Sequence, residues 1–306
     1  MGARSMSELN CDVLVIGSGA SGLAAAVTAA HFGLKVIVAE KAPVFGGTSA
    51  WSGGWLWIPR NPLAVEAGIQ EPPEGPMRYI ESELGERARD PRLPVFLANG
   101  PEMVSFFRDH TAVRWIDGNR IPDFHEGPGA LKGGRSVSAA PYDGRELGPW
   151  INKLRPPLDV TSLWGMGIAS GADMAHFFKA TRNLRSALHA ARRIAKHLRD
   201  LALHGRGMQL VNGNALVARL LRSALDKGVT LIESAPATML LRDGNRIAGA
   251  ELSTADGTVV VRAAKGVVLA TGGFPHDTPR LDELAAHAGG GAGHQAAAPR
   301  ENTGDG

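Results

Sequence analysis

Residues 13–22 read Val13-Leu14-Val15-Ile16-Gly17-Ser18-Gly19-Ala20-Ser21-Gly22, and an alanine-rich stretch and a second apolar run at 34–39 follow them. An apolar run, a G-x-G-x-x-G turn and an uninterrupted helical segment predict a strand–helix–strand unit that binds a dinucleotide. In such a unit Gly17 permits the tight turn, Gly19 lets the backbone approach a pyrophosphate, and Gly22 lets the helix pack against the strand. The phosphates would then lie at the positive end of this helix.

The second apolar run is followed by an acidic residue, Glu40, 18 residues after Gly22. A carboxylate in this place can accept hydrogen bonds from an adenosine ribose, and it disfavours a ribose phosphate. With the strand, the helix and the acid at the expected distances, the sequence predicts a nucleotide site.

A second glycine-rich loop, Gly46-Gly47-Thr48-Ser49-Ala50-Trp51-Ser52-Gly53-Gly54, comes soon after Glu40. An NAD site does not need it, whereas a flavin site uses small residues that let the chain pass under the diphosphate and close to the ring. The alternative is an ordinary glycine- and serine-rich loop. The distant strand at 266–274 favours the flavin, because its end, Ala270-Thr271-Gly272-Gly273, again brings bare backbone against a ligand.

Together these motifs resemble the flavoproteins related to fumarate reductase and succinate dehydrogenase. Within that family, residues 52–62, 122–125 with Gly129, and 134–136 are most similar to the 3-ketosteroid Δ1-dehydrogenase branch. The resemblance runs from about residue 10 to the last residue. The motifs and the resemblance place the following residues at the FAD: Gly17, Gly19, Ala20, Ser21, Gly22, Glu40, Lys41, Gly47, Thr48, Ser49, Ser52, Gly53, Gly54, Ala237, Ala270, Thr271, Gly272 and Asp305.

The resemblance also implies how the cofactor is held. Members that attach FAD through a histidine carry it beside the second glycine loop, where this chain has Gly47, so non-covalent FAD is expected. Ala237 corresponds to a residue whose backbone commonly meets the adenine part of the cofactor.

The expected fold is α/β: a Rossmann-like FAD-binding domain with a parallel sheet, a three-stranded β-meander and an irregular, helical excursion. We expect a flexible leader at 1–10, the FAD-binding domain at 11–288 with its excursion at 72–206 over the flavin side, and a mobile segment at 289–306. Relatives insert a cap domain after the strand at 266–274, and residues 302–306 resemble its start. The sequence is therefore interpreted as truncated, without the cap or the final flavin-domain segment.

Local patterns predict the remaining elements. Helices are expected at about 77–89, from 91 to 110 and at 215–227, and strands at 113–116, 229–233, 238–242, 246–253 and 258–262. Residues 172–204 carry apolar residues at helical spacing together with Arg182, Arg185, Arg192, Arg193, Lys196 and Arg199. This basic stripe is interpreted either as a solvated surface or as a contact with a membrane surface or a partner.

Composition narrows the function classes. The single cysteine, Cys11, excludes an internal disulfide and a cysteine metal site, and it favours a reducing cytoplasm. Ten histidines show no metal-binding pattern, and no metal site is predicted. The net charge of +3 comes without a nucleic-acid motif, and no apolar run approaches the ~20 residues of a membrane span.

No catalytic residue is predicted. Steroid dehydrogenases of this type use tyrosines, but the position that resembles one of them is Phe124, which has no hydroxyl. Fumarate reductases use an arginine from a region that would lie beyond residue 306. Trp51, Trp55 and Trp57 are interpreted either as a substrate wall or as packing, and Arg135 either as a surface residue or as an anion contact.

Two function classes follow. The first is an FAD-dependent oxidoreductase that introduces or reduces a carbon–carbon double bond next to a carbonyl, on a steroid- or dicarboxylate-like small molecule, with an unidentified electron partner. The second is a truncated, catalytically incomplete flavin-binding fragment. An NAD-only dehydrogenase would leave the second glycine loop unexplained.

Overall fold

The computed structural model describes residues 7–284 and 296–304. By its internal contacts the chain divides into unit 1, residues 1–53 and 141–306, and unit 2, residues 54–140. Residues 72–140 of the predicted excursion fall in unit 2 and residues 141–206 in unit 1, and the place of the excursion over the flavin side stays a prediction.

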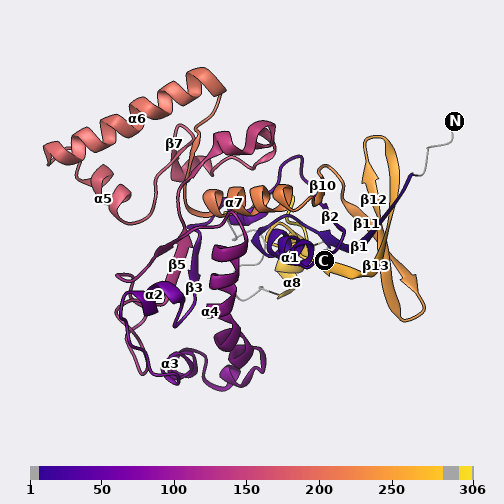
Figure 1. Ribbon diagram of the computed structural model, residues 1–306, viewed down its shortest axis with the longest axis horizontal. Coiled ribbons are helices and arrows are strands. Elements are labelled where there is room, and N and C mark those ends of the chain that lie inside the picture. The colour runs from indigo at the N-terminus through magenta and orange to yellow at the C-terminus, as the bar shows by residue number, and fades with distance from the viewer. Residues whose placement is uncertain (1–6, 285–295, 305–306) are drawn as a thin grey trace. The chain divides into compact units, whose positions relative to one another are not determined.

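Unit 1 is built on a six-stranded sheet in the order β10-β2-β1-β13-β12-β11 (Figure 1). Strands β10 (Thr230–Ile232), β2 (Val36–Ala39), β1 (Ser7–Ile16) and β13 (Gly257–Leu269) run parallel. Helix α1 (Ala20–His31) joins β1 to β2, and α7 (Asn212–Asp226) packs against α1. A parallel sheet that is covered on both faces needs strands that are apolar throughout. All four residues of β2 are apolar and buried, as this arrangement requires. The predicted α/β fold with a parallel sheet is confirmed.

The meander is present, but its third strand is longer than predicted. β11 (Ala237–Asp243) pairs antiparallel with β12 (Arg246–Thr254), which pairs antiparallel with β13. The sequence predicted separate strands at 258–262 and 266–274, whereas β13 is one strand that ends at Leu269, because residues 259–263 and 266–269 both pair with β1. Since β1 begins at Ser7 and Ser7 pairs with Val259, residues 7–10 lie in the sheet instead of in the expected leader.

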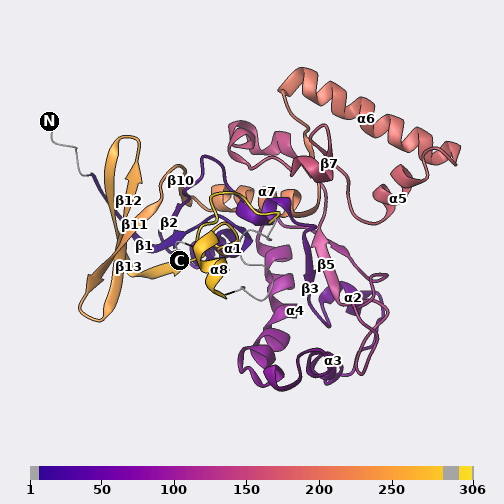
Figure 2. The same cartoon turned by 180° about the vertical axis from the view of Figure 1, so that it is seen from behind.

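The rest of unit 1 is short strands and helices, seen from behind in Figure 2. The helices predicted at 172–204 are confirmed as α5 (Ala172–Phe178) and α6 (Leu184–His204). The other elements are η1 (Gly47–Trp51), β6 (Tyr142–Asp143), η3 (Gly144–Lys153), η4 (Asp159–Thr161), β7 (Ser162–Leu163), β8 (Met166–Gly167), β9 (Gln209–Leu210) and α8 (Thr278–Leu284). Among the described residues, no helix combines the length and the apolar character that crossing a bilayer requires.

Unit 2 combines a three-stranded antiparallel sheet with helices. The strand order is β3 (Trp55–Trp57), β5 (Ser136–Ala139) and β4 (Trp115–Asp117). The helices are α2 (Pro62–Glu66), α3 (Gly75–Leu84), η2 (Gly85–Arg89) and α4 (Arg92–His110). Ile58, Val104 and Val137 form one buried cluster of the unit. Asn61 begins α2 by accepting a hydrogen bond from the Ala64 N–H, with Pro62 directly after the cap.

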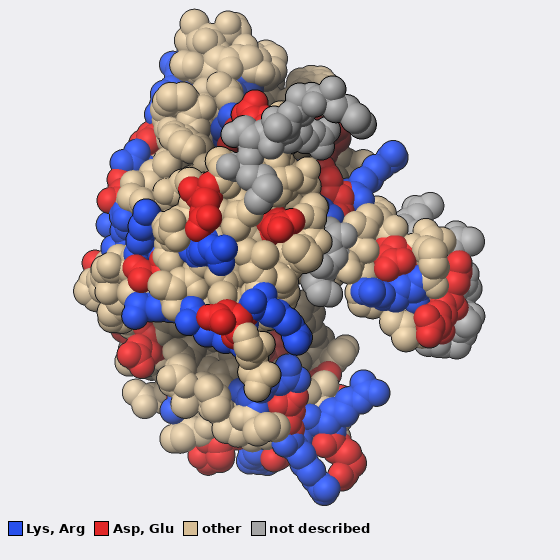
Figure 3. All heavy atoms as spheres, turned by 90° about the vertical axis from the view of Figure 1, so that its right-hand side faces the viewer, with Lys and Arg blue, Asp and Glu red and all other residues tan. Residues whose placement is uncertain are grey.

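Charge is evenly mixed on the face drawn in Figure 3. Lysine and arginine side chains there are interspersed with aspartate and glutamate. This face therefore presents no extended field of one sign.

Candidate functional site

The first glycine turn is so tight that two of its positions have no room for a side chain. Gly17 has φ +102°, and a Cβ there would lie 2.3 Å from the Ala270 carbonyl oxygen. A Cβ on Gly22 would lie 2.0 Å from the Gly17 carbonyl oxygen. Gly17 therefore makes the predicted turn, and Gly22 lets the first turn of α1 pack directly against it.

Gly19 differs from these two glycines because space is open beside it. Its φ is −64°, which any residue adopts, and the nearest atom to an added Cβ is Ser49 Oγ at 3.5 Å. Gly19 is the N-cap of α1 and forms no side-chain cap hydrogen bond. The N-terminus of α1 is therefore positively polarised, as at the helix ends where phosphates bind in nucleotide folds, although its first N–H, that of Ala20, already donates to Ser49 Oγ.

Glu40 and Ser18 join the two glycine loops. The Glu40 carboxylate accepts hydrogen bonds from the Ser18 N–H (3.0 Å), the Ser18 hydroxyl (2.5 Å) and the Ala42 N–H (2.9 Å). The Ser18 hydroxyl also accepts a bond from the Gly46 N–H at 3.0 Å. Glu40 is only 8% exposed, and its carboxylate oxygens can accept further bonds, so its role toward a ribose stays a prediction. Sequence reasoning did not include Ser18 in the site, although its place between two motif glycines was a usable signal.

A cleft of about 260 Å³ lies within unit 1 along these loops. Twelve predicted site residues line it: Gly17, Gly19, Ser21, Glu40, Lys41, Gly47, Thr48, Ser49, Ala237, Ala270, Thr271 and Gly272. The structure therefore brings together segments that are more than two hundred residues apart in the sequence. More than half of the residues that line the cleft are glycine, alanine, serine or threonine.

The other predicted site residues lie behind the cleft or beyond it. The Ala20 N–H donates to Ser49 Oγ at 3.0 Å, which ties α1 to the second loop. Ser52 accepts a hydrogen bond from the Gly213 N–H at the start of α7, and its hydroxyl donates to the Ser49 carbonyl. Gly53 ends unit 1 and Gly54 begins unit 2, and neither lines the cleft. Asp305 lies outside the described residues.

Arg155 is the main cleft residue that sequence reasoning missed. Its side chain is 8% exposed, its guanidinium carbon lies 5.3 Å from the centre of the Trp51 ring, and one of its nitrogens lies 3.7 Å from the Glu301 carboxylate. Among the described residues, its Nε has no hydrogen-bond partner. A buried cation with an unused donor is suited to an anionic ligand group. No motif marked Arg155, because it lies in the irregular part of the chain.

Residues 301–303, in the segment expected to be mobile, contact the cleft loops. The Asn302 side-chain amide donates to Thr48 Oγ1 at 2.9 Å, and Lys41 Nζ donates to Thr303 Oγ1 at 3.3 Å. Glu301 and Asn302 also line the cleft. The described part of this segment therefore contributes to the site.

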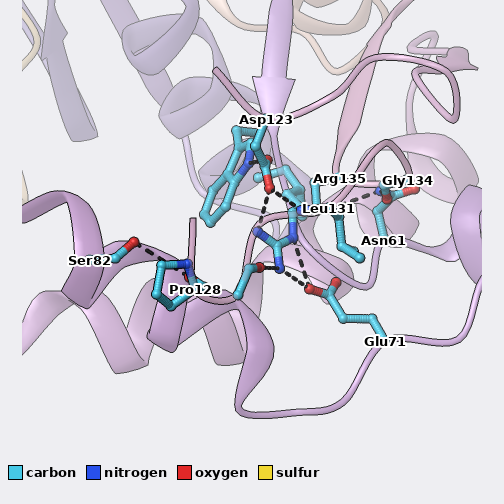
Figure 4. Close-up of polar contacts among 11 residues, drawn as sticks. Asn61, Glu71, Ser82, Asp123, Pro128, Leu131, Gly134 and Arg135 are labelled. Carbon is cyan, nitrogen blue, oxygen red and sulfur yellow. Dashed lines mark hydrogen bonds and ion pairs between the residues drawn. The ribbon is translucent and has the colours of Figure 1, made fainter. Parts of the chain in front are cut away.

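In unit 2 Arg135 corrects both interpretations offered for it. It is 1% exposed, so it is no surface residue, and its ion-pair partners are Glu71 and Asp123 of the same unit (Figure 4). Arg135 Nη1 lies 2.7 Å from Asp123 Oδ2, and Arg135 also donates to the Gly129 carbonyl at 2.7 Å. The Arg135 side chain is thus engaged by the unit's own acceptors instead of being aimed at a ligand.

The tryptophans and Phe124 also receive definite places. Trp57 stacks on Phe96, and its indole N–H donates to Asp123 Oδ1 at 2.8 Å, which supports the packing interpretation. The Trp51 indole N–H donates to the Pro156 carbonyl at 2.9 Å. Phe124 is 97% exposed.

Burial raises the pKa of the Cys11 thiol, as does the nearby Asp12, which fits a packed residue more than a reactive one.

Comparison with known proteins agrees with this site. A protein family described as FAD binding domain matches residues 12–306. A 4-oxocyclohex-2-ene-1-carboxylate 5-dehydrogenase of Sinomonas cyclohexanicum is 35% identical over 293 residues, which are 95% of this chain and 49% of that protein. A 3-oxosteroid 1-dehydrogenase of Mycolicibacterium smegmatis is 34% identical over 281 residues, 89% of this chain and 48% of that protein.

A solved structure supports the fold in detail. The crystal structure of a 3-ketosteroid Δ1-dehydrogenase from Sterolibacterium denitrificans, in complex with 1,4-androstadiene-3,17-dione, matches with a TM-score of 0.83 at 29% identity. The match covers 97% of this chain and 53% of that one. The chain spans about half the length of the curated relatives it matches. With its glycine turns, its parallel sheet and this match over almost its whole length, the chain belongs to the family of the FAD-binding domain.

Proposed function

We propose that the protein is an FAD-dependent oxidoreductase acting on a carbon–carbon bond next to the carbonyl of a cyclic, steroid-like ketone. The observation that carries the proposal is the convergence of three segments of glycine and small residues, at 17–21, 47–49 and 270–272, on one cleft. Relatives that match nearly the whole chain are dehydrogenases of 3-oxosteroids and of oxocyclohexene carboxylates.

The residues of the cleft fit the parts of FAD. The N-terminus of α1 and the open side of Gly19 suit the diphosphate, with Lys41 and Arg155 as the cations of the lining. Ala237 and its neighbours Ala235 and Pro236 offer backbone at the far end of the same cleft, where the family resemblance implies the adenine. We therefore propose that the cofactor-binding residues are those of the cleft lining.

We further propose that the FAD is held non-covalently. Among the described residues that line the cleft there is no histidine, cysteine or tyrosine. At Gly47, where relatives with covalent FAD carry a histidine, the backbone has φ +48° and no side chain. The proposal predicts that denaturation with acid releases all of the flavin into the supernatant.

The bound cofactor would supply hydride transfer, and the chain would supply position and shielding. The titratable side chains of the described lining are Glu40, Lys41, Arg155 and Glu301, and Glu40 is already committed to Ser18 and Ala42. For this reason we assign no catalytic acid or base. We propose an electron acceptor that reoxidises the flavin, and a cytoplasmic setting, which the single buried cysteine supports.

Anaerobic mixing tests the proposal. The chain is loaded with FAD, freed of excess cofactor, and mixed without oxygen with a 3-oxosteroid or with 4-oxocyclohexanecarboxylate. Loss of the visible flavin absorption with either ketone is the expected result. Flavin that stays oxidised with both ketones, yet is reduced by dithionite, would assign this chain to flavin binding alone.

A further inference from the structure

Helix α6 packs against the rest of unit 1 through its polar side. Its buried positions are Ser186, Ala190, Arg193, His197 and Asp200. A second row, at four- and three-residue spacing, is exposed: Leu184, Leu188, Ala191, Ala195, Leu198 and Ala202. The leucines of this row are 77%, 63% and 51% exposed, in chain order. A helix of a soluble protein normally turns such a row toward its core.

The inward face accounts for the attachment of α6 to unit 1. Arg193 donates to the Gly167 carbonyl at 3.0 Å and to the Asp173 carboxylate at 3.2 Å. His197 Nε2 lies 2.9 Å from the Trp164 carbonyl oxygen. Figures 1 and 2 both draw α6 at an edge of the structure, with α5 and β7 on one side of it. The apolar row is therefore not used in holding the helix.

A row of basic residues runs beside the apolar row. Arg185, Arg192 and Arg199 each directly follow a residue of the apolar row, and Lys196 lies between them; all four are exposed. The one acid of α6, Asp200, is 1% exposed and is ion-paired with Arg145; it also lies 3.9 Å from Arg199, whose side chain remains 63% exposed. In α5, Asp173 is mostly covered and is paired with His189 and Arg193. The exposed surface of α6 thus presents positive charge and apolar groups together, without an exposed acid.

We propose that α6 is a docking surface for a membrane that contains anionic phospholipid. The apolar row would enter the boundary of the acyl chains while the arginines meet lipid phosphates. A hollow of about 260 Å³ beside the basic row, bounded by His189, Arg192, Arg193, Lys196 and Gln209, offers space for a headgroup. Two neighbouring large side chains, Trp164 and Phe178, are also exposed and would add to the apolar contact.

Charge also decides against a second copy as the occupant. In an antiparallel helix pair through the apolar row, Arg185, Arg192 and Arg199 of each copy would face those of the other copy, and like charges would repel. A lipid surface of negative charge is complementary to the same arginines. The inference does not rest on FAD, because none of these residues lines the nucleotide cleft.

The test is sedimentation of the full 306-residue chain with phosphatidylcholine vesicles, made with and without phosphatidylserine, at low and high salt. We expect binding to the anionic vesicles that is at least tenfold stronger than to pure phosphatidylcholine and that weakens with salt. A triple variant of the apolar row, Leu184→Ser, Leu188→Ser and Leu198→Ser, should lower binding at least tenfold. A triple variant of the basic row, Arg185→Gln, Arg192→Gln and Arg199→Gln, should remove the preference for phosphatidylserine.

Matched controls come from unit 2, where exposed residues of the same kinds occur. Arg87→Gln with Arg89→Gln and Arg92→Gln removes three charges, and Val65→Ser with Phe124→Ser removes two exposed apolar groups. Both controls should bind anionic vesicles as the original chain does. The proposal is overturned if the folded chain does not bind anionic vesicles, or if the controls lose as much binding as the α6 variants. It is also overturned if the original chain self-associates without binding vesicles and the leucine variant abolishes that self-association. The apolar row would then be a contact between copies.

Discussion

The nucleotide cleft of unit 1 and the ion cluster around Arg135 in unit 2 differ in the groups that form them. The cleft consists largely of glycines, small residues and a helix end, and its tightest contacts are between backbone atoms. The cluster consists of side chains: Arg135 is held by Glu71 and Asp123, and it lies 5.5 Å from the ring centres of both Trp57 and Tyr79. The first arrangement leaves polar groups available to a ligand, whereas the second uses its charges within the protein.

Because of this difference, the two regions should tolerate different substitutions. A buried ion cluster fails when one charge is removed, because its partners are left without compensation. A cleft formed by closely packed backbone loses its shape when a side-chain atom is added at one of its glycines. Substitutions that subtract a charge in unit 2 and add a methyl group in unit 1 therefore test the contrast.

The largest loss of stability is expected from Arg135→Met. It leaves the Glu71 and Asp123 carboxylates buried without their cation, and it should lower the free energy of unfolding by about 4 kcal/mol. Urea unfolding followed by tryptophan fluorescence measures the change. Arg89→Met, at a side chain that is 81% exposed, is the control and should change stability by less than about 0.5 kcal/mol. Equal effects of the two variants would show that the cluster does not stabilise unit 2.

Gly22→Ala should have the next largest effect. Its Cβ would lie 2.0 Å from the Gly17 carbonyl oxygen, and backbone must shift to admit it, at a cost of about 3 kcal/mol. The variant should also fail to retain FAD on gel filtration. Gly127→Ala is the matched control, since the nearest atom to its Cβ is 3.7 Å away and its φ is not positive. Full FAD retention by Gly22→Ala would contradict the turn geometry.

Asp123→Asn should cost less, about 2 kcal/mol. The asparagine oxygen can still accept from the Trp57 indole or the Leu131 N–H, and Glu71 still balances the charge of Arg135. Thermal unfolding of this variant beside Arg135→Met ranks the two losses. If Asp123→Asn proved as damaging as Arg135→Met, the two carboxylates would not share the cation as the structure indicates.

The smallest effect on stability is expected from Gly19→Ala, although its effect on the cofactor should be large. Gly19 has an ordinary φ and open space beside it, so the change in unfolding free energy should stay within about 0.5 kcal/mol. A methyl group at the helix end where a diphosphate approaches should weaken FAD binding at least tenfold. Fluorescence titration with FAD provides the measurement, and unchanged affinity would move the diphosphate away from Gly19.

Part of the fold and part of the cleft could be predicted from the sequence. The turn at Gly17, the order of β1, α1 and β2, the meander and the helices of residues 172–204 were predicted, because each depends on residues close together in the chain. The cleft lining at Gly47–Ser49 and Ala270–Gly272 could be predicted because the family motifs join these distant segments.

Side-chain partnerships across long distances were not predictable. Arg135 meets Glu71 over 64 residues, and no local pattern connects them. Arg155 was missed for a related reason, since its importance depends on what surrounds it in space, whereas Ser18 lies between two motif glycines and could have been included. The sequence analysis divided strand β13 in two, because pairing with β1, which runs on both sides of Gly266, cannot be read from local residues.

The most direct test of the central claim, that this cleft holds FAD, is the visible spectrum of the purified chain after incubation with FAD and gel filtration. We expect flavin absorption that elutes with the folded protein, at about one FAD per chain, and that is lost in Gly22→Ala. A chain that circular dichroism shows to be folded, but that elutes without flavin when FAD is in excess, would contradict this claim.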